Sequence, residues 1–222
     1  GKFDFSDNQA TGTLLPTAEE EGLYVIARPG PYIKAEISMG GLPATMSSQP
    51  GPLRGTANLA RSKQWLHAFD AIARKHQVTT GGGSLLMYQV ENELLDESSD
   101  RSAFLKALTS YVRADGITVP LFTNDYSMAG HFSDTSKYGT DFYAYDSYPL
   151  GFTCNGKRNA LSDHEAEFRA IAPATPQFIT EAQGGAFTPW GAPFTPSACA
   201  TFADPAFTRQ WGCLLYTSPS PR

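Results

Sequence analysis

The sequence predicts an α/β fold of the (β/α)8 TIM-barrel type that is incomplete in this chain. Strand-like and helix-like patterns alternate along the 222 residues, which is typical of parallel strands joined by helical crossovers. The strands are apolar along most of their length, as in a sheet covered by helices on both faces. Polar residues gather at the carboxyl-terminal ends of the strands, where barrels carry their sites. An eight-stranded barrel takes about 250 residues, and five strands are predicted here, so the barrel is expected to be partial.

The predicted strands are short runs of apolar, aromatic or β-branched residues bounded by Gly, Pro, Asn or Asp. They are "GLYVIARPG" (22–30), "SLLMYQV" (84–90), "VPLFTND" (119–125), "DFYAYDSYP" (141–149) and "QFITEAQ" (177–183).

The predicted helices lie between these strands and show apolar residues at helical spacing. They cover residues 58–76, 98–115 and 162–172, and "TAEEEG" (17–22) ends a helix before the first strand. Asn58 is expected to cap the first of these helices with its side chain. Gly116 is expected to stop the second, because glycine readily adopts the left-handed conformation that ends helices.

Composition narrows the possible functions. The net charge is −5 and the basic residues are scattered, which argues against a nucleic-acid partner. The longest apolar runs have the length of strands, so no membrane partner is expected. The stretch "ARPGPY" after the first strand lacks G-x-G-x-x-G spacing, which argues against a dinucleotide-binding fold. The histidines and cysteines lack metal-ligand spacing, which argues against a metal site.

The three cysteines are Cys154, Cys199 and Cys213. The first two lie in Gly-, Pro- or Asn-rich loop sequence, which favours a Cys154–Cys199 disulfide over a pair of buried thiols. Such a bridge would close a loop of about 45 residues and stabilise the fold by roughly 3–4 kcal/mol in the chain-entropy model.

Two glutamates lie on the ends of separate apolar strands, and this pattern indicates catalytic chemistry. Glu93 follows Asn92 after the apolar run 84–90, and Glu181 comes directly after "FIT" (178–180) in the last predicted strand. Glycoside hydrolysis uses two carboxyl groups of this kind: one protonates the leaving oxygen, and the other attacks the anomeric carbon or activates water. Asp125 and Asp146, also near strand ends, are expected to organise hydrogen bonds.

Three segments in order resemble glycoside hydrolase family 35, the β-galactosidases. "GLYVIARPGPYIKAEISMGGLP" (22–43), "LLMYQVENE" (85–93) and "TPQFITEAQGGAFTPWG" (175–191) are similar to the family's signatures at strands three, four and seven. "YDSYPLGF" (145–152) resembles the sixth-strand end of fungal-type members. The resemblance implies that the chain holds about strands three to seven, with residues 1–212 as a partial catalytic barrel.

The resemblance also implies the activity, a reaction that needs no metal and no cofactor, and the roles of individual residues. The parent protein would remove terminal non-reducing β-D-galactose from β-galactosides by double displacement, with Glu93 as acid/base and Glu181 as nucleophile about 5 Å apart. Asn92 would bind the sugar 2-hydroxyl. The other residues implied to contact or support the sugar are Lys34, Glu36 and Tyr148, and Tyr32 is interpreted as scaffold beside them.

Glu91 and Lys34 are harder to interpret. Glu91 either orients sugar hydroxyls or their neighbours, or is a structural carboxylate paired with a donor such as Arg28. Lys34 stands where the family usually has Asn or Cys, and its ammonium would attract Glu36 or a catalytic carboxylate. Leu94, where the family usually has Tyr, is another departure from its pattern.

The sequence leaves open other functions for the chain and more than one location for the parent protein. The chain could come from another retaining β-glycosidase of the same barrel clan, of the β-glucosidase or β-mannosidase type, or be a non-catalytic sugar-binding fragment. The fungal-type resemblance and the predicted disulfide indicate a secreted parent, with lysosome or vacuole as the alternative location. The Ser/Pro-rich end, 213–222, is interpreted as a non-native tail, and an open barrel with unpaired strand edges is expected to have little activity by itself.

Overall fold

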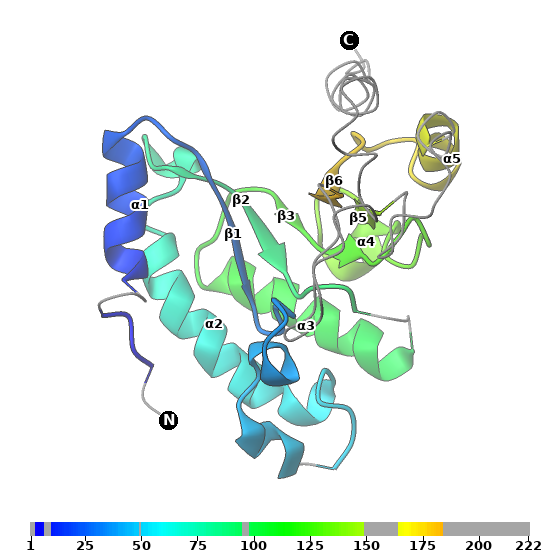
Figure 1. Ribbon diagram of the computed structural model, residues 1–222, viewed down its shortest axis with the longest axis horizontal. Coiled ribbons are helices and arrows are strands. Elements are labelled where there is room, and N and C mark those ends of the chain that lie inside the picture. Colours follow the sequence, from blue (N-terminus) through cyan, green and yellow to red (C-terminus); the bar gives the residue numbers. More distant parts are fainter. Residues whose placement is uncertain (1–2, 7–9, 49, 95–97, 149–163, 184–222) are drawn as a thin grey trace, which may run out of the picture. The chain divides into compact units, whose positions relative to one another are not determined.

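The computed structural model describes residues 3–6, 10–48, 50–94, 98–148 and 164–183 (Figure 1). The chain divides into two compact units. The first comprises 1–124 and 134–142, and the second comprises 125–133 and 143–222. Each is described separately below.

The first unit contains a parallel sheet in the order β1-β2-β3, with helices packed against it (Figure 1). Its strands are β1 (Val25–Gly30), β2 (Leu85–Val90) and β3 (Leu121–Phe122). Its helices are α1 (Thr11–Glu20), α2 (Leu59–Ala73), α3 (Ser99–Ala114) and the single turn α4 (Thr135–Tyr138). Four 3-10 turns lie between them, η2 (Ser38–Gly41), η3 (Ala44–Ser48), η4 (Thr56–Asn58) and η5 (Val78–Thr80).

The second unit contains β5 (Ala144–Ser147), β6 (Ile179–Ala182) and helix α5 (His164–Ile171). The two strands are parallel. They belong to a sheet of order β4-β5-β6, in which β4 (Asn124–Asp125) supplies Asp125 to this unit. A cluster of buried residues, Tyr143, Tyr145, Phe168 and Ala172, forms its core.

The predicted elements are found, with two corrections. The predicted strand 119–125 is two short strands, β3 and β4, because Thr123 between them is in neither ladder. Asn58 is at the N-cap of α2 but makes no side-chain capping bond; its amide instead donates to the Pro52 carbonyl at 3.5 Å. The stop after α3 is confirmed, since Gly116 has φ +94°.

Helix α3 buries the apolar residues that its sequence places at helical spacing. Its predicted apolar face, Phe104, Leu105, Leu108 and Val112, is fully buried. Complete burial of a Leu or Phe side chain stabilises a fold by about 1.5–3 kcal/mol, so this face docks the helix on its neighbours.

A carboxyl group is buried where α2 meets β2. Asp70 is fully buried and accepts a 2.7 Å hydrogen bond from the Tyr88 hydroxyl, while its Oδ2 has no partner among the described residues. Burial raises the pKa of Asp70 to about 7, although the Tyr88 hydrogen bond opposes this. Asp115 raises the pKa further, and His67 lowers it.

The folded protein is therefore expected to lose stability as the pH rises through the Asp70 titration. Between the unfolded pKa of 3.8 and the folded pKa of about 7, the folded state binds more protons than the unfolded chain. The free energy of unfolding should fall across this window, by roughly 4 kcal/mol at most, and level off above it. Thermal unfolding from pH 4 to 8 measures this fall. The Asp70→Asn variant should lose this part of the fall and keep the part due to other buried carboxyl groups with a raised pKa, such as Asp125. A fall as steep as in the wild type would rule out a contribution from Asp70.

The described helices include none long and apolar enough to cross a membrane.

Candidate active site

In the first unit, the turn after β2 carries the predicted acid/base. Glu91 and Glu93 both have left-handed backbone, with φ of 67° and 46°. Residues other than glycine adopt this conformation at a cost and keep it only where their surroundings impose it. The contacts that hold this turn are therefore part of the site.

Glu91 is fully buried beneath the turn. Its carboxylate accepts hydrogen bonds from Arg54 Nε at 2.8 Å and from the Tyr32 backbone N–H at 3.2 Å. Burial raises the pKa of Glu91, and the Arg54 guanidinium works in the opposite direction. Of the two interpretations offered for Glu91, this geometry favours the structural carboxylate, although the cation found on it is Arg54, whereas the expected partner was Arg28.

Asn92 is buried and held by its oxygen. Its Oδ1 accepts from Arg28 Nη2 at 2.8 Å and from Gln89 Nε2 at 3.2 Å. Its Nδ2 has no hydrogen-bond partner among the described residues. A buried amide nitrogen without a partner costs free energy, so this N–H group can donate to a ligand hydroxyl.

Glu93 is 7% exposed and is held at both ends. Its backbone N–H donates to Asn124 Oδ1 at 3.1 Å, and its carboxylate forms a 2.7 Å ion pair with Lys34 Nζ. The ammonium at position 34 thus contacts a predicted catalytic carboxylate, as its charge led us to expect. The Lys34 side chain is 42% exposed, so water screens this pair.

The segment after β1 forms the wall beside this turn. Lys34, Ala35 and Glu36 all have positive φ, and Glu36 is exposed. Lys34, Glu36, Tyr32 and Arg54 line a surface pocket of about 520 Å³. The pocket can accept a polar ligand, because its lining carries an ammonium, a guanidinium and a carboxylate.

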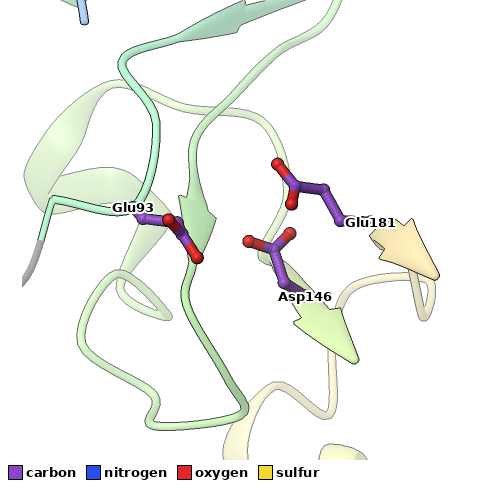
Figure 2. A group of neighbouring side chains, drawn as sticks. All are labelled: Glu93, Asp146 and Glu181. Atoms are coloured by element: carbon purple, nitrogen blue, oxygen red, sulfur yellow. The ribbon is translucent and has the colours of Figure 1, made fainter. Parts of the chain in front are cut away.

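In the second unit, the predicted nucleophile lies on β6 beside an aspartate on β5. Asp146 and Glu181 are register partners in this parallel pair, and they carry carboxylate oxygens within 4.8 Å of each other (Figure 2). The Tyr148 hydroxyl donates to Glu181 Oε2 at 2.5 Å. Asp146 accepts from Thr180 Oγ1 at 2.5 Å. Tyr148 thus donates to one oxygen of Glu181.

Asp125 does not belong to that pair and organises its own surroundings. Its buried carboxylate accepts from the Tyr143 hydroxyl at 2.8 Å and from the His131 backbone N–H at 2.9 Å. Burial raises its pKa to about 6, and the Tyr143 hydrogen bond and His131 oppose the rise. These bonds tie the loop after β4 to the start of β5.

Two residues of the first unit were missed. Gln89 donates to the Glu91 carbonyl at 2.9 Å and to Asn124 Oδ1 at 2.7 Å, in addition to Asn92. Gln89 could have been recognised from sequence, because it is an amide side chain inside the apolar run "LLMYQV" (85–90). Arg54 gave no such signal, since it stands in a Pro- and Gly-rich stretch that has no periodicity. The predicted disulfide residues, Cys154 and Cys199, lie outside the described residues, as does the end 213–222.

Strand-end carboxylates on parallel strands are typical of the barrel glycoside hydrolases, and comparisons with known proteins agree with this class. The family model described as glycosyl hydrolases family 35 matches residues 1–209, so the chain belongs to this family. It is 34% identical over 221 residues to probable beta-galactosidase A of Neosartorya fischeri, covering 94% of this chain and 22% of that protein. It is 37% identical over 209 residues to beta-galactosidase A of Aspergillus niger, covering 88% of this chain and 20% of that protein.

Solved structures support the fold. The beta-D-glucuronidase of Dictyoglomus thermophilum matches with a TM-score of 0.50 at 13% identity, over 72% of this chain and 27% of that one. The endo-1,4-beta-D-mannanase of Thermotoga petrophila matches with a TM-score of 0.50 at 14% identity, over 97% of this chain and 69% of that one. These likenesses show an incomplete TIM barrel. The chain spans about a fifth of the length of the curated relatives.

Proposed function

We propose that the whole protein containing this segment is a retaining β-galactosidase that removes terminal non-reducing β-D-galactose. Membership of family 35 carries the proposal, and the local geometry supports the residue roles. Glu181 receives a tyrosine hydroxyl bond, which suits a carboxylate that must stay ionised to attack. Glu93 lies on a turn with left-handed backbone, next to Asn92, whose side-chain nitrogen has no hydrogen-bond partner among the described residues.

The reaction has two steps. Glu181 attacks the anomeric carbon while Glu93 protonates the glycosidic oxygen, so the bond to the leaving group breaks and a galactosyl–Glu181 ester forms. Glu93 then takes a proton from water, whose oxygen attacks the anomeric carbon and releases Glu181 and β-galactose. This route requires the two carboxyl groups to lie about 5–5.5 Å apart. In it, Asn92 donates to the 2-hydroxyl, and Lys34 and Glu36 contact other hydroxyls.

The full-length protein tests this proposal directly. It should hydrolyse p-nitrophenyl β-D-galactoside in preference to the β-glucoside and β-mannoside, and NMR should detect β-galactose as the first product. A preference for either of the other sugars would favour a different retaining β-glycosidase, and α-galactose as first product would exclude retention. The 222-residue chain by itself is proposed to have little activity. Hydrolysis by that chain, if lost in Glu181→Gln, would contradict this.

Secretion and a Cys154–Cys199 disulfide belong to the same proposal. The fungal-type sequence features support both. Peptide mass mapping of the secreted full-length protein, with and without reduction, should find the two cysteines linked in one non-reduced peptide pair. Free thiols at both positions would exclude the bridge.

A further inference from the structure

Arg54 reaches the turn after β2 from the loop between η3 and η4. Its side chain is 14% exposed, and the Glu91 side chain that it contacts is fully buried. A guanidinium is always charged and presents its N–H groups in a rigid plane, so it can bond several acceptors in fixed geometry. The groups that Arg54 bonds are therefore held in a defined geometry.

The guanidinium contacts two successive residues of the turn. Nε donates to Glu91 Oε2 at 2.8 Å, and Nη2 lies 2.6 Å from the same oxygen and also donates to the Asn92 backbone carbonyl. One side chain thus bonds the carboxylate of Glu91 and the peptide that leads into Glu93.

Tyr32 packs against the guanidinium of Arg54. The Arg54 guanidinium carbon lies 4.0 Å from the centre of the Tyr32 ring, a cation–π contact. The Tyr32 N–H itself bonds Glu91 Oε1 at 3.2 Å. The ring is also packed against Gly40, where a Cβ would overlap it. Arg54, Tyr32 and Glu91 therefore form one connected group beneath the turn.

We propose that Arg54 is a positioning residue that holds Asn92 and Glu93 in their working orientation. Gln89 on β2 and Asn124 on β4 bond the turn, and Arg54 bonds it from the loop between η3 and η4. Left-handed Glu91 and Glu93 need such bonds to persist. The inference rests on the proposed function, because it assigns Arg54 a role in that reaction.

The test compares Arg54 variants in the full-length protein. Arg54→Ala should lower kcat for p-nitrophenyl β-D-galactoside about 100-fold, the effect expected of a misplacement near 1 Å, and should change KM much less. Millimolar guanidinium should restore part of that kcat, because it can occupy the vacated space. Arg54→Lys should stay impaired, since a single ammonium lacks the rigid fork with which the guanidinium bonds both the Glu91 carboxylate and the Asn92 carbonyl.

Arg113 supplies a matched control. It donates to the Ile117 and Val119 carbonyls at 2.9 and 2.8 Å and pairs with Asp141 at 2.5 Å. Arg113→Ala should therefore lower the melting temperature while kcat, measured well below that temperature, stays near wild type and is unaffected by guanidinium.

The outcomes separate this inference from the proposed function. A wild-type protein without β-galactosidase activity would remove the proposed function itself. An active wild type whose Arg54→Lys and Arg54→Ala variants keep wild-type kcat would overturn the positioning role only. If Arg54→Ala does not fold, Arg54→Lys decides: a folded, slow enzyme supports the proposal, and a folded enzyme of wild-type kcat refutes it.

Discussion

Replacing Glu181 with glycine in the full-length protein is expected to lower kcat for 2,4-dinitrophenyl β-D-galactoside on the order of 10⁵-fold. The proposed reaction passes through a covalent bond to this carboxylate, and loss of a covalent nucleophile has effects of this size in other enzymes. Dinitrophenolate is a good leaving group whose departure needs little protonation, so the acid contributes little to this reaction. The loss of kcat therefore reports on the nucleophile.

Added azide should partly restore the Glu181→Gly enzyme. Azide can enter the space that the carboxylate leaves and attack the anomeric carbon from the same side, so the product should be α-galactosyl azide, identified by NMR. Glu167→Gln on α5, an exposed position, is the matched control and should keep wild-type kcat. Wild-type turnover in Glu181→Gly, or β-galactosyl azide from it, would show that Glu181 is not the nucleophile.

The sequence predicted the elements well where one physical rule acts locally. In α3, every third or fourth residue is apolar, and a helix must bury that face, so Phe104 and Leu108 could be assigned to the core directly. The strand 119–125 was wrong in detail because ladder bonds depend on neighbouring chains. Thr123 looks strand-like by itself, and only the pairing of Leu121 and Phe122 with β2 ends the first ladder there.

The candidate site divides in the same way. Glu93 and Glu181 could be singled out from sequence because each lies close to the end of an apolar run, and barrels place their chemistry at such strand ends. Arg54 could not, because its partner Glu91 is 37 residues away and the loop that carries it follows no periodic pattern. Lys34 was recognised as unusual from sequence, yet its contact with Glu93 depends on a left-handed backbone that Lys rarely adopts.

Glu93→Gly should give a second large effect, one that depends on the leaving group. Protonation by a positioned acid contributes about 10²–10⁴-fold, so kcat/KM for a β-galactoside with an alcohol leaving group should fall by about that factor. For 2,4-dinitrophenyl β-D-galactoside, Glu181 can still attack without the acid. The first step should stay fast while water, now without a base, attacks the ester slowly. Stopped-flow absorbance should then show a burst of dinitrophenol followed by a slow steady rate.

Azide should distinguish the two glutamates by stereochemistry. In Glu93→Gly the galactosyl–Glu181 ester still forms, and azide attacks it from the face that water normally uses, so the product should be β-galactosyl azide. The opposite anomers from the two variants would assign the two roles independently of any measured rate. An equal loss with both leaving groups, without a burst, would contradict an acid/base role for Glu93.

The Lys34→Asn variant is an informative comparison, because Lys34 contacts Glu93. This change removes the ion pair but leaves the carboxyl group of Glu93 in place. The variant should therefore show no burst of dinitrophenol, and its kcat/KM should depend only weakly on the leaving group.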